Sequence, residues 1–221
     1  MTEWLAERAQ RVVAVEVDSA LAETLREKLG ASPRIEIVRA DILATDLATL
    51  CRERGAPQCC VFGNLPYYIT SPILHHLFRS AGRIRTMALL VQREVAERIV
   101  AQPGSRDYGY LSVLAQVHSR PRILLGVPPG AFSPPPKVHS ALVGFEMTAK
   151  FSDWSADQVQ EFLDFVKRCF AQKRKNLLNN LAARYGRERV EPALAAGRLL
   201  PNLRAEQLTL EQFAELFERL R

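Results

Sequence analysis

The chain has 221 residues, of which 48% are hydrophobic, so it can bury a substantial core and is not expected to be intrinsically disordered. Its apolar runs fall far short of the roughly 20 residues that span a membrane, and no leader opens the sequence, so we expect a cytoplasmic protein without a membrane partner. Thirty Lys and Arg against 24 Asp and Glu leave a formal charge of +6, which favours a polyanionic partner without identifying it.

Short apolar runs alternate with helical patterns through the first half of the chain. Residues 12–15 (VVAV) are apolar and mostly β-branched, which predicts a strand buried on both faces of a parallel sheet. The runs at residues 35–38, 59–62 and 87–91 predict three more strands, and residues 73–78 predict a helix between the last two. Strands that alternate with helices indicate an α/β fold with a mostly parallel sheet.

The first strand is expected to lead into a helix that Asp18 or Ser19 caps. Leucines repeat at helical spacing as far as Leu29, and Gly30 and Pro33 mark the end of this helix.

A smaller domain of helices is predicted after residue 148. Ser155 with Gln158 and Thr209 with Gln212 each form the pattern of a capping box, and an apolar stripe at helical spacing follows both. We therefore expect an α/β domain over residues 1–148 and an all-helical domain over residues 149–221. Residues 128–136 hold five prolines and predict an irregular loop.

Polar side chains follow three of the predicted strands, namely Glu16, Asp41 and Asn64. Ligands of parallel sheets sit beyond the carboxyl ends of the strands, where an acidic residue commonly accepts hydrogen bonds from ribose hydroxyls. For one such carboxylate, a solvated loop residue or a helix cap is the better interpretation. Glu16 and Asp41 together are more specific, and they indicate a nucleoside cofactor whose reactive end points toward Asn64.

The pentapeptide 64–68 (NLPYY) directly follows a predicted strand. The amide oxygen of Asn64, a backbone carbonyl next to the rigid Pro66 and the aromatic ring of Tyr67 suit a planar group that bears an NH₂, such as adenine. Two acceptors on the amino hydrogens would favour a more tetrahedral and nucleophilic nitrogen, so no strong base is required. The structural alternative is a strand-to-turn junction with aromatic packing.

These features resemble the ribosomal RNA adenine N6-dimethyltransferases of the small-subunit, KsgA-like type. The resemblance extends over essentially the whole chain, and its most specific parts are the pentapeptide and an F-x-P-x-P-x-V-x-S element. The stretches that carry it are residues 13–18 (VAVEVD), 39–42 (RADI), 63–70 (GNLPYYIT), 91–98 (VQREVAER), 108–114 (YGYLSVL), 132–143 (FSPPPKVHSALV) and 170–181 (FAQKRKNLLNNL).

The resemblance implies a Rossmann-like methyltransferase sheet followed by the small helical domain, with S-adenosylmethionine as the cofactor. Glu16 would bind the cofactor ribose, Asp41 and the backbone near Ile42 its adenine, and Asn64 would lie close to its methionine moiety. The family methylates two adjacent adenines in a loop near the 3′ end of small-subunit ribosomal RNA, in the course of ribosome biogenesis. The implied partner is that RNA in a pre-30S particle, bound by a monomer.

The resemblance also implies the residues that act on the target base. Tyr67 would stack on the adenine, Phe132 would cover its other face, and Asn64 with the Leu65 carbonyl, oriented by Pro66, would hold its amino group. Unstacking an adenine costs less free energy in a loop than in a duplex. Each base–aromatic contact offsets roughly 1 to 3 kcal/mol of this unstacking cost.

A basic segment fits an RNA partner. The window 167–189 holds eight Lys and Arg and the single acid Glu188, an excess that favours phosphate contact over an ordinary solvated helix face. The cations expected to contact RNA are Lys137, Lys173, Arg174 and Lys175.

The sequence departs from the family pattern at its start. The family begins with a helical segment, a strand and a glycine-rich loop around the methionine part of the cofactor, and the sequence opens with a helix expected downstream of that loop. No glycine precedes Gly30, which puts cofactor binding and activity in doubt and predicts that the neighbouring strands are either separated or newly paired. Three interpretations stay open: a fragment of a full enzyme, a shortened RNA-binding assembly factor, and a relative of the antibiotic-resistance methyltransferases that modify large-subunit RNA.

The remaining polar residues indicate no further site. The four cysteines and four histidines do not fall at metal-ligand spacing, so neither a metal nor a disulfide framework is predicted. Residues 92–94 (QRE) could touch RNA, although surface charge pairing is the better interpretation. For Tyr108, the sequence leaves two roles open, namely loop packing and base stacking.

Overall fold

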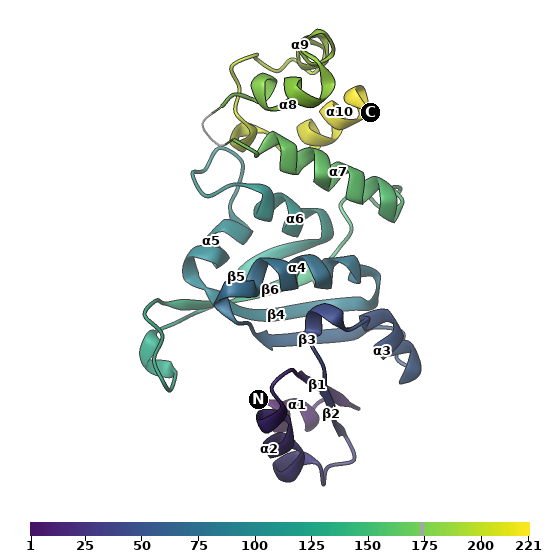
Figure 1. Cartoon of the computed structure of the whole chain (residues 1–221), viewed down its shortest axis with the longest axis vertical. Coiled ribbons are helices and arrows are strands. Elements are labelled where there is room, and N and C mark those ends of the chain that lie inside the picture. The colour runs from purple at the N-terminus through teal and green to yellow at the C-terminus, as the bar shows by residue number, and fades with distance from the viewer. Residues whose placement is uncertain (173–174) are drawn as a thin grey trace. The chain divides into compact units, whose positions relative to one another are not determined.

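The computed structural model describes residues 1–172 and 175–221. The chain divides into two compact units, Met1–Pro57 with Pro72–Arg83 (unit 1) and Gln58–Ser71 with Ile84–Arg221 (unit 2), and Figure 1 shows the elements of each. The predicted boundary between residues 148 and 149 falls inside unit 2 and stays a prediction.

Unit 1 is built around two strands. Its elements are α1 (Thr2–Ala6), β1 (Val12–Glu16), α2 (Ser19–Leu29), β2 (Ile35–Arg39), the 3₁₀ turn η1 (Ile42–Ala44), α3 (Leu47–Glu53), most of α4 (Thr70–Arg79) and the 3₁₀ turn η3 (Ala81–Arg83). The two strands pair in parallel, with Val12 opposite Ile35 and Glu16 opposite Arg39. Both predicted strands are confirmed, and so is the Asp18 cap of α2, which accepts a hydrogen bond from the Leu21 N–H at 2.8 Å.

The strands of unit 1 are less buried than the sequence predicts. Every residue of β1 is half-buried, whereas the β-branched run predicted burial on both faces. A pair of strands has no inner strand, so each member keeps one edge free and part of its surface accessible. The sequence analysis left two outcomes for the neighbouring strands, separated or newly paired. The described chain shows the first, because β1 and β2 form a sheet of their own.

Unit 2 contains the larger sheet, of four strands. They are β3 (Cys59–Asn64), β4 (Ile84–Gln92), β5 (Ser119–Val127) and β6 (Ser140–Met147), in the order β3-β4-β6-β5. β3 runs parallel to β4, but β6 is antiparallel to both β4 and β5. The expectation of a mostly parallel sheet is therefore wrong for this unit, and the sheet is mixed.

The reason is a pair of strands that the apolar patterns did not reveal. β5 carries Pro121 and five consecutive exposed residues, so it does not read as a buried strand. It is an edge strand, where one side makes no ladder hydrogen bonds and a proline is tolerated. The proline-rich loop connects it to β6 and contains a 3₁₀ turn, η4 (Pro129–Ala131).

Helices make up the rest of unit 2. They are the 3₁₀ turn η2 (Tyr67–Ile69), α5 (Arg93–Val100), α6 (Tyr110–His118), α7 (Ala156–Cys169), α8 (Leu177–Tyr185), α9 (Arg187–Ala196), the 3₁₀ turn η5 (Ala205–Gln207) and α10 (Leu210–Leu220). Both capping boxes are confirmed: Ser155 accepts from the Gln158 N–H at 3.2 Å, and Thr209 accepts from the Gln212 N–H at 3.3 Å. Figure 1 shows α7 to α10 gathered together at the C-terminal end of the chain.

No helix among residues 1–172 and 175–221 is long and apolar enough to cross a membrane. The same residues contain no group of three or more His, Cys, Asp and Glu side chains that could hold a metal ion. Within the described part of the chain, the cysteines form no disulfide.

Candidate functional site

The predicted cofactor residues of unit 1 lie at one edge of its sheet. Glu16 is the last residue of β1, and its carbonyl accepts a hydrogen bond from the Ala40 N–H at 3.0 Å. Asp41 follows Ala40 directly and caps η1. The parallel pairing therefore brings both carboxylates to the carboxyl ends of neighbouring strands, as the sequence predicts.

Each carboxylate keeps one oxygen available for a ligand. Glu16 Oε1 accepts from the Asp18 N–H and Asp41 Oδ1 from the Leu43 N–H, both at 2.9 Å. The second oxygen of each accepts no hydrogen bond within the described part of the chain, and there the Ile42 N–H donates none. Two carboxylate oxygens and one N–H are the groups that ribose hydroxyls and an adenine edge need, so these residues fit a nucleoside cofactor.

The pentapeptide lies at the corresponding edge of the sheet in unit 2. Asn64 ends β3 opposite Leu90, and the Leu65 N–H continues the ladder by donating to the Leu90 carbonyl at 3.0 Å. The Leu65 side chain is buried, whereas Asn64 and Pro66 on either side of it are exposed. Burial of Leu65 thus anchors the segment and leaves its polar groups accessible.

Two acceptors of this segment have no partner among the described residues. The side-chain amide of Asn64 makes no hydrogen bond there, and the Leu65 carbonyl accepts none. The next carbonyl, that of Pro66, is engaged by the Ile69 N–H at 3.2 Å and by the Thr70 hydroxyl at 3.3 Å. The free acceptors are therefore the pair that the sequence assigns to an amino group.

Tyr67 is held by a residue that the sequence analysis did not identify. Its hydroxyl lies 2.5 Å from the Oγ of Ser140, which is fully buried at the start of β6. Ser140 sits opposite Gln92 of β4 and Val127 of β5, so two strands fix its position. The sequence did offer a general signal, because a buried phenol hydroxyl usually has a hydrogen-bond partner, but this signal does not identify Ser140 as the partner. In contrast, Tyr68 is 87% exposed.

Phe132 and Lys137 lie on the long loop between β5 and β6, which extends away from the sheet in Figure 1. The paired residues Val127 and Ser140 form the base of this loop. Phe132 is half-buried and its N–H donates to the Pro129 carbonyl at 3.1 Å, while Lys137 is exposed. Because Ser140 bonds Tyr67, the loop that carries Phe132 begins beside the pentapeptide. Stacking of both rings on one base stays a prediction.

The predicted RNA-binding cations are described in part. Lys173 and Arg174 lie outside the described residues. Lys175 is exposed just before α8, and Lys167 and Arg168 are exposed in the last turn of α7. Arg187 pairs with Glu191 at 3.3 Å, so the basic window includes cations that already have partners.

The structure decides two interpretations that the sequence left open. Arg93 pairs with Glu97 at 2.8 Å and Arg98 with Glu94, so α5 shows surface charge pairing. Tyr108 is 1% exposed and its ring meets that of Phe170 edge-on at 6.2 Å, which is loop packing.

Known proteins resemble the chain along its whole length. A family model described as "Ribosomal RNA adenine dimethylase" matches residues 1–221. A ribosomal RNA small subunit methyltransferase A from Acidobacterium capsulatum is 45% identical over 221 residues, which is 100% of this chain and 77% of that protein.

Solved structures agree with these matches. The 23S rRNA methyltransferase ErmE is similar with a TM-score of 0.70 and 31% identity, over 99% of this chain and 85% of that one. A dimethyladenosine transferase from Plasmodium falciparum has a TM-score of 0.75 over 97% of this chain and 84% of that one, and at 19% identity it supports the fold alone.

Proposed function

The chain belongs to the ribosomal RNA adenine dimethylase family, and on that premise we propose that it dimethylates N6 of two adjacent adenines near the 3′ end of small-subunit ribosomal RNA. The match over the whole chain confirms the family resemblance stated from the residues. Members of the family use S-adenosylmethionine, which supplies an electrophilic methyl group on sulfur.

The two free acceptors at the end of β3 carry this proposal. The Asn64 side-chain oxygen and the Leu65 carbonyl accept the two N6 hydrogens of a bound adenine, which draws the nitrogen lone pair out of ring conjugation. Bound S-adenosylmethionine would supply the methyl group, whose bond to sulfur would break as the bond to N6 forms, and one N6 hydrogen would leave as a proton to water. For the second transfer, N6 carries one hydrogen, so one of the two acceptors suffices.

Tyr67 and Phe132 provide the aromatic surfaces for the extruded base. The bond from Tyr67 to Ser140 orients the phenol ring, and the loop that carries Phe132 starts beside that bond. Base–aromatic stacking of roughly 1 to 3 kcal/mol per contact offsets the few kcal/mol that unstacking costs. Pro66 restricts the backbone between the two acceptors and Tyr67.

In unit 1, Glu16 accepts hydrogen bonds from the cofactor ribose, and Asp41 with the Ile42 N–H binds its adenine. In unit 2, Asn64 contacts the methionine moiety. The free oxygen of each carboxylate and the undonated N–H support the first two assignments.

The proposed partner is the small-subunit RNA within a pre-30S particle, bound by a monomer in the cytoplasm during ribosome biogenesis. The formal charge of +6 and the exposed cations Lys137, Lys167, Arg168 and Lys175 support contact with phosphates.

A large-subunit target is the second candidate, favoured by the similarity to ErmE at 31% identity. The 45% identity to a small-subunit methyltransferase over the whole chain supports the first.

The test incubates the full chain with methyl-labelled S-adenosylmethionine and either immature small subunits or large-subunit RNA, and then quantifies N6,N6-dimethyladenosine by mass spectrometry. Small-subunit label is the expected result. Asn64→Ala should lower kcat by about 100-fold or more, as losing one preorganised polar contact to a developing charge does. Asn202→Ala removes an exposed amide elsewhere in unit 2 and should leave kcat unchanged.

Label found in large-subunit RNA would transfer the assignment to the second candidate. RNA binding with no label in either RNA would favour the non-methylating assembly factor.

A further inference from the structure

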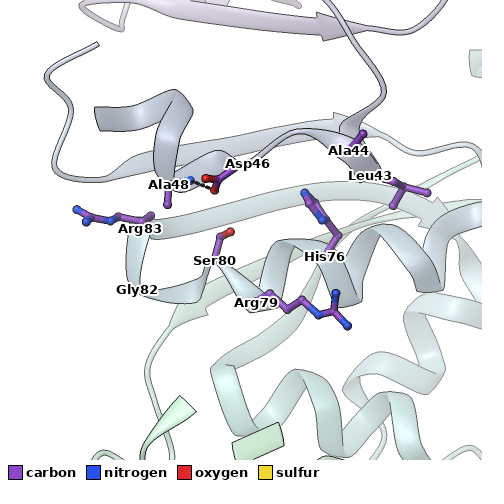
Figure 2. Close-up of a pocket in the computed structure, with 9 residues that line it drawn as sticks. All are labelled: Leu43, Ala44, Asp46, Ala48, His76, Arg79, Ser80, Gly82 and Arg83. Atoms are coloured by element: carbon purple, nitrogen blue, oxygen red, sulfur yellow. Dashed lines mark hydrogen bonds between the residues drawn. The ribbon is translucent and has the colours of Figure 1, made fainter. Parts of the chain in front are cut away.

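Unit 1 contains a cavity of about 620 Å³ that none of the residues assigned above lines. One wall comes from the segment after η1, with Leu43 and Asp46, and the other from the end of α4 and from η3, with His76, Arg79, Ser80 and Arg83. Figure 2 shows His76 and Ser80 pointing toward the segment that carries Asp46.

The cavity presents two cations without a carboxylate partner. Arg79 is exposed and makes no hydrogen bond or ion pair with any described residue. Arg83 donates to the Pro57 carbonyl at 3.4 Å and pairs with no carboxylate in the described chain. Two other arginines of unit 1 do have such partners, namely Arg8 with Glu7 at 2.9 Å and Arg26 with Glu23 at 3.1 Å.

Asp46, the one acidic residue of the lining, is already engaged. Its Oδ1 accepts from the Ala48 N–H at 2.9 Å and its Oδ2 from the Thr49 hydroxyl at 2.5 Å, so it caps α3. The hydrogen bond from Thr49 also lowers the pKa of Asp46, and so it stays ionised. Both oxygens already accept hydrogen bonds from the chain, and within the described residues the carboxylate forms no ion pair with either guanidinium group.

Two further polar groups of the lining, on His76 and Ser80, suit the ribose of a nucleotide. His76 Nε2 lies 2.8 Å from the Thr45 carbonyl, which can only accept, so Nε2 carries a hydrogen and Nδ1 is left for a ligand. The Ser80 hydroxyl can both donate and accept. A ribose 2′-hydroxyl is a donor and an acceptor in the same way, and it distinguishes RNA from DNA.

We propose that this cavity is a second RNA-binding site, in which Arg79 and Arg83 bind phosphates of one RNA strand and His76 with Ser80 contacts its ribose. The inference rests on the proposed function only in taking RNA as the ligand.

The arrangement favours a strand over a free phosphate ester. Figure 2 shows the guanidinium groups of Arg79 and Arg83 toward opposite sides of the cavity. A compact phosphate meets one of them, whereas a strand with consecutive phosphates meets both. The volume of about 620 Å³ also exceeds what a single phosphate fills.

The test compares the wild-type chain with the double variant Arg79→Gln, Arg83→Gln. The probe is a fluorescent single-stranded oligoribonucleotide of about 12 nucleotides, titrated at several salt concentrations. The variant should bind about 3- to 10-fold more weakly near 0.1 M salt, and the slope of log K against log salt should fall by about 0.7 for each phosphate that the protein no longer binds. Affinity for S-adenosylmethionine, measured by calorimetry, should not change.

The matched control is Arg8→Gln with Arg26→Gln, which removes the same two charges from unit 1 outside the cavity. If both double variants lost the same affinity for the oligoribonucleotide, net charge alone would explain the effect, and the proposed site would be overturned. Unchanged affinity in the cavity variant would also overturn it, as would a wild-type chain that does not bind the probe. If adenosine monophosphate binding depends on Arg79 and Arg83 while oligoribonucleotide binding does not, the cavity takes a free phosphate ester instead.

Methyl transfer is measured on the same wild-type protein. Failure of the proposed function would appear as absent methyl transfer while the difference between the two double variants persists.

Discussion

At the scale of single residues, Tyr67 shows how a functional side chain is positioned. Its hydroxyl bonds Ser140, which has no exposed surface and which β4 and β5 hold from either side. A side chain with one hydrogen bond at its tip and one covalent bond at its base loses most of its rotational freedom. In the proposed role, the ring is therefore a preformed surface for a base, and the entropic cost of ordering it is met on folding rather than on binding.

We predict that Ser140→Ala and Tyr67→Phe each lower the methylation rate and destabilise the fold by about 1 kcal/mol, because each removes the same hydrogen bond. The double variant should be no worse than either single variant. Methyl transfer and urea denaturation on all three proteins would check this. Additive losses would mean that the two residues act separately, and Ser112→Ala offers a control at another buried hydroxyl, which donates to the Arg98 carbonyl.

The ion pair between Glu36 and Arg54 predicts a pH dependence of stability. Arg54 Nε donates to Glu36 Oε2 at 2.9 Å, and the second guanidinium contact is to Oε1. This pairing holds the pKa of Glu36 below its ordinary value of 4.5. Since the pKa is lowered on folding, the contribution is complete above about pH 4.5 and is lost as the pH falls through the folded value.

Glu36→Gln should therefore destabilise the protein near neutral pH and match the wild type in stronger acid. The Glu36 side chain is 40% exposed, so solvent screening limits the effect to about 1 kcal/mol or less. Urea denaturation at pH 7 and below pH 4 would measure both values. A variant that is equally destabilised at both would show that the charge is irrelevant.

At the scale of elements, α7 organises the C-terminal helices around aromatic side chains. The Ser155 capping box starts the helix, and Phe162 within it has no exposed surface. The Phe162 ring meets those of Phe151, Trp154 and Phe217 with centroids 5.3 to 5.7 Å apart at steep angles. Edge-to-face contacts of this kind add to the burial of apolar area. One residue thus joins α7 to α10 and to the segment before the helix.

Phe162→Ala is predicted to destabilise the protein by about 3 to 5 kcal/mol, the cost of removing a buried aromatic ring and leaving a cavity. Phe162→Leu should cost considerably less because it keeps most of the apolar volume. Ser155→Ala, which removes only the helix cap, should cost about 1 kcal/mol. Chemical denaturation of the three variants would test the order, and a Phe162→Ala protein as stable as Ser155→Ala would contradict it.

At the scale of the whole molecule, the two units differ in how well their sheets are buried. Every residue of β1 is half-buried, whereas β4 and β6 contain fully buried positions such as Leu89, Val91 and Val143. Local opening costs least where little apolar surface is buried. Unit 1, which carries Glu16 and Asp41, is therefore the more easily opened part of the protein.

We predict that backbone amides of β1 and β2 exchange with solvent faster than those of β4 and β6. Saturating S-adenosylmethionine should slow exchange in β1 and β2, because a ligand at 100 times its Kd stabilises the bound form by about 2.7 kcal/mol. Hydrogen–deuterium exchange with and without cofactor would measure both effects. Equal protection of the two sheets would contradict the first part, and no change with cofactor the second.

Local signals in the sequence determined many of the elements and the polar strand ends that we propose as ligand sites. Strands at residues 12–16 and 59–64, the caps at Asp18 and Ser155 and the polar strand ends Glu16, Asp41 and Asn64 all follow from patterns a few residues long. Periodicity and capping are properties of neighbours along the chain, so they can be read without a structure. The family motifs indicated the family for the same reason, since each is a short run of residues.

Tertiary structure alone decided what depends on residues far apart in the chain. The antiparallel pairing of β6 with β4 and β5 changed the predicted sheet, and the bond from Tyr67 to Ser140 spans 73 positions. The cavity lined by Asp46, Arg79 and Arg83 likewise joins two distant segments. Such contacts form because the backbone brings side chains together in space, and a single sequence carries no periodic signal for a pair so widely separated.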